Sequence, residues 1–166
     1  RLQEEYQPPK YTAINIPYYD SETYAVVDVA YTMLGKEYVW GGNYMELGDL
    51  LGNKSTTGTD CSGLCQYCYY KSGLMEETGI DGRWVTYSYS MYNNSNGKFV
   101  TLETAQAGDV VFTNFNSDGE PEHVMIYVQN NNNGSIKIIE AQQEGVPILE
   151  RDVVYDSSTM KIRRLI

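Results

Sequence analysis

Basic residues are scarce in this 166-residue sequence, which has 12 lysines and arginines against 22 acidic residues and a formal net charge of −10. Binding to nucleic-acid phosphates relies on clustered lysine and arginine to displace counterions, so DNA and RNA are poor candidates as ligands. Long hydrophobic runs are also missing. The longest, such as 124–128, fall far short of the roughly 20 apolar residues that cross a bilayer, and the sequence predicts no membrane span.

Cysteine and histidine are rare as well. Three cysteines are an odd number and too few for a scaffold held together by disulfides. His123 is the only histidine, so chemistry near neutral pH that needs an imidazole must use it. The first residues lack the basic, apolar leader of a signal peptide, and we therefore expect an excised mature domain.

The chain itself shows a helical pattern followed by strand patterns. The proline-containing stretch 1–19 has little periodicity and is predicted to be a linker or N-terminal arm that leads from an upstream domain. Residues 20–166 are predicted to form one domain, whose five glycines between 41 and 59 indicate a loop that approaches another element or a ligand closely.

Apolar periodicity and turn residues place the elements of that domain. Helices are expected at 20–35, at 61–72 and, more weakly, around 85–92. Strands are expected at 109–113, 123–128, 136–141, 146–151 and 160–165. Helices followed by strands predict an α+β fold, with a helical N-terminal half packed on a mostly antiparallel β-sheet.

The Asn-rich run 130–134 is expected to be a hairpin turn. If Val128 pairs with Ser135 across it, His123 lies directly opposite Glu140 on the neighbouring strand. Side chains in such a pair have Cβ atoms about 4.5–5.5 Å apart. The sequence therefore predicts that the Glu140 carboxylate orients the imidazole.

Cys61 is expected in the first turn of its helix, where free N–H groups and the helix dipole favour the thiolate. An imidazole beside such a thiol makes a nucleophile, and a third polar group fixes the orientation of the ring. Cys61, His123 and Glu140 can fill these three roles. Cys65 and Cys68 continue an apolar helix face with Leu64 and are expected to pack in the core.

Four motifs follow one another along the chain, namely Tyr38-Val-Trp-Gly-Gly42, Thr59-Asp-Cys-Ser-Gly63, Gly108-Asp-Val-Val-Phe112 and His123-Val-Met-Ile-Tyr127. In order and rough spacing they resemble the NlpC family of cell-wall cysteine peptidases, which has a papain-like core. The resemblance runs from about Tyr24 to Glu150. The resemblance implies an NlpC-like domain that cleaves the stem peptides of peptidoglycan, usually between γ-D-glutamyl and the following diamino acid. It also implies an extracellular or wall-associated location.

Matching by position, the resemblance implies that Cys61 is the nucleophile and His123 the general base and later acid, with no metal or organic cofactor. Glu140 stands where family members carry His, Asn, Gln or an acid and would orient His123.

Three further residues match positions that line the substrate site, namely Tyr38, Asp60 and Ser62. Asp60 can equally be a helix cap. Arg83 lies near a family arginine, but Asp81-Gly82 replaces the Leu-Pro common there, so Arg83 is left out of the predicted site.

The cysteines also fit three different kinds of site. The spacing of Cys61, Cys65 and Cys68 occurs in radical S-adenosylmethionine proteins, which hold an iron–sulfur cluster. Cys65 and Cys68 alone form a C-x-x-C pair like that of thioredoxins. The three cysteines together with His123 could hold a zinc ion. CHAP-type amidases and endopeptidases share the order Cys then His and cut other wall bonds. An inactive wall-binding domain is a further alternative.

Overall fold

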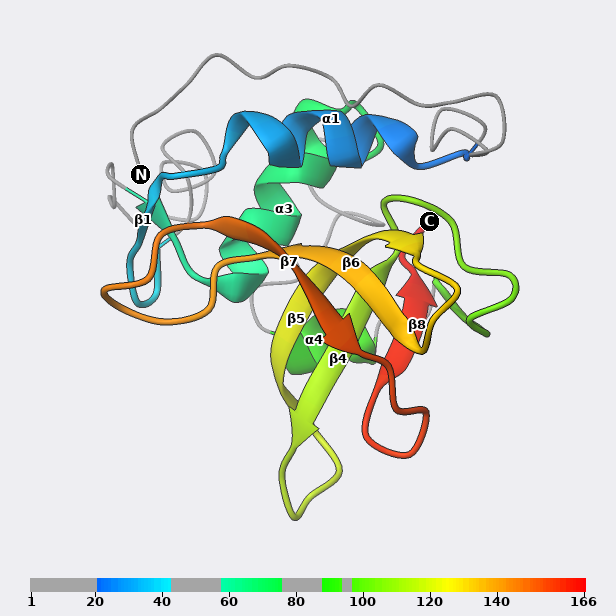
Figure 1. The fold of residues 1–166 in the computed structure, drawn as a ribbon. Helices are drawn as coiled ribbons and strands as arrows, with labels where there is room; N and C mark the ends of the chain where they lie inside the picture. Colours follow the sequence, from blue (N-terminus) through cyan, green and yellow to red (C-terminus); the bar gives the residue numbers. More distant parts are fainter. Residues whose placement is uncertain (1–20, 43–57, 76–87, 94–96) are drawn as a thin grey trace.

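A computed structural model describes residues 21–42, 58–75, 88–93 and 97–166 (Figure 1). It has the α+β arrangement expected from the sequence. The helices are α1 (Tyr24–Thr32), α3 (Cys61–Lys71) and α4 (Ser88–Tyr92). The strands are β1 (Glu37–Tyr38), β2 (Gly58–Thr59), β3 (Lys98–Val100), β4 (Val110–Phe115), β5 (Pro121–Asn130), β6 (Ser135–Glu140), β7 (Leu149–Val154) and β8 (Lys161–Arg164).

Six strands form one antiparallel sheet in the order β3-β8-β4-β5-β6-β7. The last strand, β8, thus lies inside the sheet between β3 and β4. β1 and β2 form a separate parallel pair of two residues each. None of the described helices is long and apolar enough to span a membrane.

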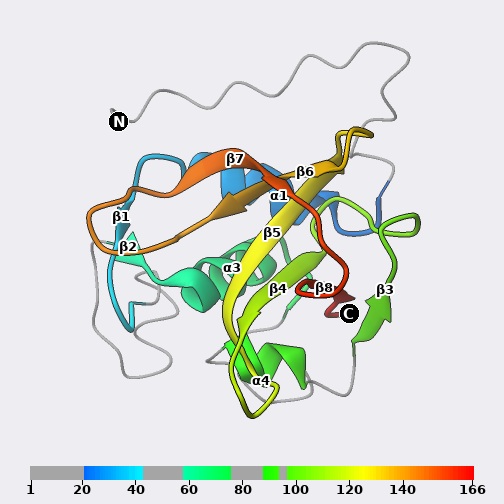
Figure 2. The same ribbon diagram turned by 60° about the horizontal axis from the view of Figure 1, so that its bottom comes forward.

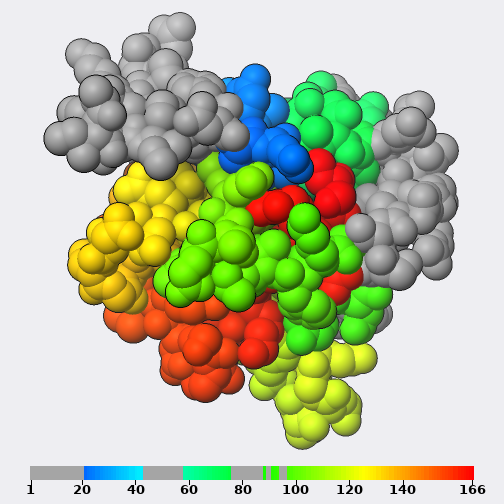
Figure 3. Space-filling model, turned by 90° about the vertical axis from the view of Figure 1, so that its right-hand side faces the viewer, coloured from blue at the N-terminus to red at the C-terminus, as the bar shows by residue number. Residues whose placement is uncertain are grey.

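The sheet is covered by apolar side chains on both faces. On one face α3 packs between α1 and β5, and almost every residue of α3 is buried (Figures 1 and 2). Alternate residues of the strands point to the other face, where a second cluster forms; its buried members are Val111, Met125, Tyr127, Ile136, Ile138, Val153 and Ile162. Seen from the side, the segment after β3 lies over β8 (Figure 3).

α3 begins and ends where the sequence predicts. Asp60 precedes it with extended backbone, and its Oδ1 accepts the backbone N–H of Gly63 at 2.7 Å, which satisfies one of the free donors of the first turn. Ser72 ends the helix, and Gly73 follows with a φ of 80° that glycine adopts without strain. Cys61 is therefore fixed as the first helical residue.

α1 begins at Tyr24, later than expected, because the polar residues before it bond to another element. The hydroxyls of Ser21 and Thr23 donate to the carbonyl of Ala107, at 2.9 and 2.5 Å. The next residue, Gly108, has a φ of 95°, and a Cβ there would lie 2.0 Å from the Thr23 carbonyl oxygen. Only glycine allows this approach of the strand to the helix.

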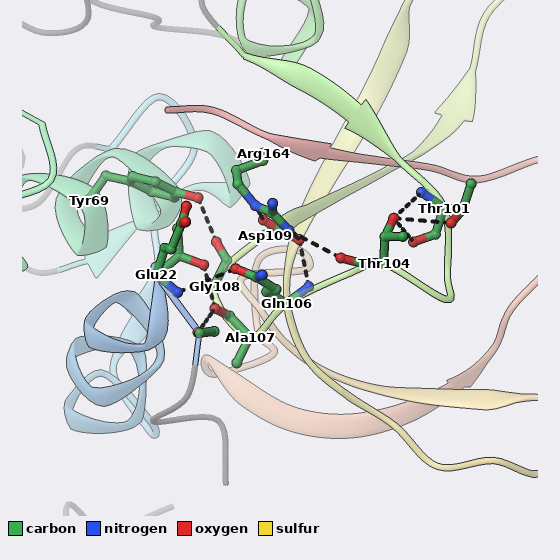
Figure 4. Close-up of polar contacts among 11 residues, drawn as sticks. Glu22, Tyr69, Thr101, Thr104, Gln106, Ala107, Gly108, Asp109 and Arg164 are labelled. Atoms are coloured by element: carbon green, nitrogen blue, oxygen red, sulfur yellow. Dashed lines mark hydrogen bonds and ion pairs between the residues drawn. The ribbon is translucent and has the colours of Figure 1, made fainter. Parts of the chain in front are cut away.

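A buried ion pair lies beside this contact between Ala107 and the residues before α1 (Figure 4). The guanidinium of Arg164 donates to both oxygens of Asp109, at 2.9 and 3.0 Å, and Tyr69 of α3 donates its hydroxyl to the carbonyl of Gly108 at 2.6 Å. β4, β8, α1 and α3 are thereby joined at one point, which accounts for the Gly-Asp motif in structural terms.

The predicted register of the β5–β6 hairpin is wrong. Tyr127 pairs with Ile138 and Gln129 with Lys137, with a bulge between them. The strands run on into the Asn-rich segment, where Asn132 and Gly134 adopt left-handed φ values of 59° and 87° and make the turn tighter than expected. Extending this register places Glu140 opposite residue 125, so it is not directly opposite His123 as predicted.

Other boundaries also differ. β7 starts three residues later than expected, because Ile148 exchanges backbone hydrogen bonds with Gly35 and Lys36 instead, at 2.8 and 2.9 Å. β3 and the β1–β2 pair were not predicted. The glycine-rich segment does approach another element, since a Cβ at Gly58 would lie 1.8 Å from the Glu37 carbonyl oxygen. The predicted arm 1–19, Arg83 and the first residues of the third predicted helix lie outside the described residues.

Candidate active site

The thiol, the imidazole and the carboxylate singled out in the sequence come together at one end of the sheet. Cys61 is the first residue of α3 and is partly exposed. His123 lies near the start of β5, close enough to Cys61 for an interaction between the two side chains to raise its pKa. Nε2 of His123 is 2.7 Å from Oε1 of Glu140, the last residue of β6.

The protonation of His123 is set by these two partners. Burial lowers its pKa, because the charged imidazolium is poorly solvated, but hydrogen bonds with Cys61 and Glu140 and the negative charges on both raise it. The balance brings the pKa of His123 to about 9. At neutral pH the ring is therefore an imidazolium, which can donate a proton to a neighbouring group.

Glu140 has no exposed surface, and each of its oxygens has a partner. Oε1 faces His123, and Oε2 accepts a hydrogen bond from Nε of Arg151 on β7. Burial raises the pKa of Glu140, but the hydrogen bonds and charges of His123 and Arg151 lower it below its ordinary value. The carboxylate is ionised and can only accept, so Nε2 of His123 carries the proton of that bond.

Sequence reasoning missed Arg151. Its strand was expected, but the pairing of β7 with β6, in which Arg151 is opposite Ile138, was not. The signal that could have found it is a basic residue on the same face of its strand as Leu149 and Val153, where it can reach a carboxylate on the neighbouring strand.

Tyr38 is buried beside the thiol. Burial raises its pKa to about 12, and the negative charges of Cys61, Asp60 and Glu144 act in the same direction. The phenol therefore keeps its proton and is a hydrogen-bond donor next to Cys61.

Asp60 and Ser62 are both engaged in the first turn of α3. Oδ1 of Asp60 accepts the Gly63 N–H and, at 3.2 Å, the hydroxyl of Ser62. Burial raises the pKa of Asp60, and hydrogen bonds with Gly63, Ser62 and Gly41 oppose this. The capping role considered for Asp60 is confirmed, and Ser62 is only 3% exposed.

A polar pocket of about 390 Å³ adjoins the imidazole. It lies over the face of the sheet that carries Met125 and Val153, which is opposite α3. Around His123 and Glu140 it is lined by Thr113, Asn114, Gln142, Gln143 and Arg151. The pocket offers amide and guanidinium groups to a bound molecule next to the candidate general acid.

The other two thiols belong to the core. Cys65 and Cys68 are fully buried, and burial raises the pKa of each well above its ordinary value. Within the described ranges no three His, Cys, Asp or Glu side chains are arranged to hold a metal ion. The zinc and cluster sites considered as alternatives therefore have no set of ligands in this part of the chain.

Two comparisons with known proteins identify the family of the chain. The sequence model of the NlpC/P60 family matches residues 35–164. Protein P54 of Enterococcus faecium is 33% identical to the chain over 122 residues, which are 73% of the chain. The aligned region spans only 18% of the length of that relative.

Proposed function

The chain belongs to the NlpC/P60 family, whose members are generally cysteine peptidases that act on the cell wall, and we propose that it is a cysteine endopeptidase of peptidoglycan stem peptides. The position of His123 between Cys61 and Glu140 is the observation that carries the proposal. The arrangement supports the roles of nucleophile for Cys61, proton carrier for His123 and orienting carboxylate for Glu140.

The geometry supports a two-step mechanism. Nε2 of His123 is occupied by Glu140, so Nδ1 is the ring nitrogen left to serve Cys61. The Cys61 thiolate attacks the scissile carbonyl carbon, and His123 gives its proton to the departing amine as the C–N bond breaks. The now neutral imidazole then takes a proton from water, which hydrolyses the thioester. This step regenerates the Cys61 thiolate and the protonated His123.

Negative charge develops on the carbonyl oxygen in each step. The backbone N–H of Cys61 lies at the N-terminus of α3, where it has no partner within the helix and can donate to that oxygen. Tyr38, which keeps its phenolic proton beside Cys61, is the second candidate donor.

We propose that the enzyme cleaves the bond between γ-D-glutamyl and the following diamino acid of the stem peptide. Because His123 protonates the departing amine, the diamino acid is proposed to lie on the His123 side of the sulfur. Asp60 and Ser62 lie in or beside the first turn of α3, next to Cys61, and the charge of Cys61 acts on Tyr38. These three residues are proposed to contact the γ-D-glutamyl side of the substrate. Such a substrate places the protein outside the cell membrane or in the wall.

Digestion of purified peptidoglycan, with fragments identified by mass spectrometry, tests the proposal. The wild type is expected to release a stem peptide that ends in D-glutamate and to expose a new amine on the diamino acid. Cys61→Ala is expected to remove all cleavage while Cys68→Ala, a change in the core of the same helix, keeps it.

Three results would contradict the proposal. Cleavage retained by Cys61→Ala would exclude Cys61 as the nucleophile. A cut at another wall bond would support a CHAP-like activity, and binding to peptidoglycan without cleavage would support an inactive wall-binding domain.

A further inference from the structure

We propose that Arg151 is a positioning residue of this site, which fixes the buried Glu140 carboxylate in the orientation that binds His123. The expected effect of Arg151 on peptidoglycan cleavage rests on the proposed function. The contact between Arg151 and Glu140 does not depend on that function. Arg151 acts through Glu140 and has no described contact with His123 or Cys61.

The three side chains form a row across three neighbouring strands. Glu140 on β6 has His123 on β5 at one side and Arg151 on β7 at the other. Both contacts are diagonal, because the residue paired with Glu140 on β7 is Leu149 and Arg151 pairs with Ile138. The two partners therefore approach the carboxylate from opposite directions along the strand, and together they leave it one orientation.

Burial makes the second partner necessary. Glu140 is 0% exposed, so water cannot solvate the oxygen that does not face His123. An ionised carboxylate with one unpaired oxygen in such a place tends to rotate or to take up a proton. Arg151 removes both outcomes, since its Nε–H satisfies that oxygen and its charge favours the ionised form.

The other charged groups near this row are common to every variant considered below. His123 also interacts with Cys61 of α3, and the charges of Cys61, Asp60 and Glu144 of the loop after β6 act on Tyr38 of β1. Among the described interactions, none of these groups apart from His123 hydrogen-bonds to Glu140. A change in pH dependence on replacing Arg151 therefore reports on the carboxylate.

Direct contact with the substrate is the competing role for Arg151. Its side chain is 42% exposed and lines the polar pocket, so it could bind an anionic part of the substrate. A substrate-binding arginine changes KM and leaves the free enzyme's thiol chemistry as it was. A positioning arginine changes the reactivity of Cys61 with no substrate present.

The experiment compares Arg151→Gln and Arg151→Lys with the wild type and with Lys137→Gln. Lys137 lies on β6 and pairs with Asp152 of β7 at 3.1 Å, so its replacement removes one cation from the same pair of strands without touching Glu140. The readouts are the rate of Cys61 alkylation by iodoacetamide against pH, and kcat and KM for peptidoglycan cleavage against pH.

In Arg151→Gln, Glu140 is expected to take up a proton at higher pH. Burial, which raises the pKa of Glu140, is then opposed mainly by His123 and no longer by the charge of Arg151. The acid limb of the alkylation profile and of the kcat profile should move up by about one pH unit, and kcat at neutral pH should fall about tenfold with KM nearly unchanged. Arg151→Lys keeps the charge and should lie between Arg151→Gln and the wild type. Lys137→Gln should match the wild type.

An alkylation profile of Arg151→Gln identical to that of the wild type would overturn the inference, as would a rise in KM with kcat and its pH profile unchanged. Alkylation needs no substrate, so a shifted profile in a protein that does not cleave peptidoglycan would refute the proposed function and leave the role of Arg151 standing. Circular dichroism of each variant establishes that the fold is intact, and Arg151→Lys tests the inference if Arg151→Gln does not fold.

Discussion

Nε2 of His123 lies 2.7 Å from Oε1 of Glu140, although the two residues are not paired across β5 and β6. Diagonal neighbours in a sheet are about 7–8 Å apart at the backbone, a gap that a long side chain can bridge. Glutamate spans it here because its carboxylate is turned along the strand, between His123 and Arg151. The contact depends on the length of the side chain as well as on its charge.

Replacing Glu140 should lower activity without removing it. Glu140→Ala is expected to reduce kcat about 100-fold, because the imidazole loses the group that orients it, whereas Cys61→Ala should leave no turnover. Glu140→Gln keeps a hydrogen-bond acceptor of the same length and should lose less. Steady-state rates on peptidoglycan fragments check this order, and full activity in Glu140→Ala would indicate Gln142 or Gln143 as the orienting residue.

The three thiols should differ in reactivity. Cys61 is partly exposed, while Cys65 and Cys68 are fully buried and burial raises the pKa of both. Iodoacetamide is therefore expected to modify Cys61 alone in the folded protein and all three after unfolding in urea. Mass spectrometry of proteolytic peptides locates the label. Comparable labelling of Cys68 in the native state would contradict the packing of α3.

Stability should fall as the pH rises above neutrality. The pKa of His123 is raised from 6.5 to about 9, so the folded state keeps a proton that the unfolded state releases between these values. The stabilisation is fully present below pH 6.5 and is lost as the pH rises through about 9, by up to about 3 kcal/mol. Urea unfolding across this range measures it. In His123→Gln this part of the pH dependence should disappear, and an unchanged curve would refute the raised pKa.

Gly108→Ala should be strongly destabilising, because it combines an unfavourable φ of 95° with a Cβ 2.0 Å from the Thr23 carbonyl oxygen. Gly119→Ala is the matched control, with a φ of 76° and nothing within 4 Å of the added Cβ. The control is expected to cost about 1–2 kcal/mol and Gly108→Ala at least about 3 kcal/mol. Thermal unfolding separates the two, and equal losses would show that the contact with Thr23 is relieved at little cost.

Local signals in the sequence were enough to predict α3 and the elements of the site. Asp60 caps the start of α3 and Gly73 follows its end, and both signals depend only on residues within one helical turn. Such local signals can be recognised in the sequence without knowledge of the fold. The place of Cys61 at the start of α3 follows from them. The apolar run 124–128 likewise predicted β5, which extends from Pro121 to Asn130.

Register and tertiary partners could not be predicted in the same way. The bulge after Tyr127 and the left-handed Asn132 change the pairing of β5 with β6, and many asparagines in a row give no unique turn. The strand predicted at 146–151 included Ile148, but the backbone of Ile148 is hydrogen-bonded to Gly35 and Lys36 instead. Arg151 reaches Glu140 only once both strands are correctly aligned.

The position of β8 in the sheet also constrains when the protein can fold during its synthesis. Residues 161–164 enter the sheet between β3 and β4, and Arg164 neutralises the buried Asp109. During synthesis the earlier strands leave the ribosome first, yet β3 has no neighbour in the sheet until β8 arrives. Translation must therefore pass residue 164 before the sheet can be completed, and a nascent chain that stops earlier leaves the Asp109 carboxylate without its counter-ion.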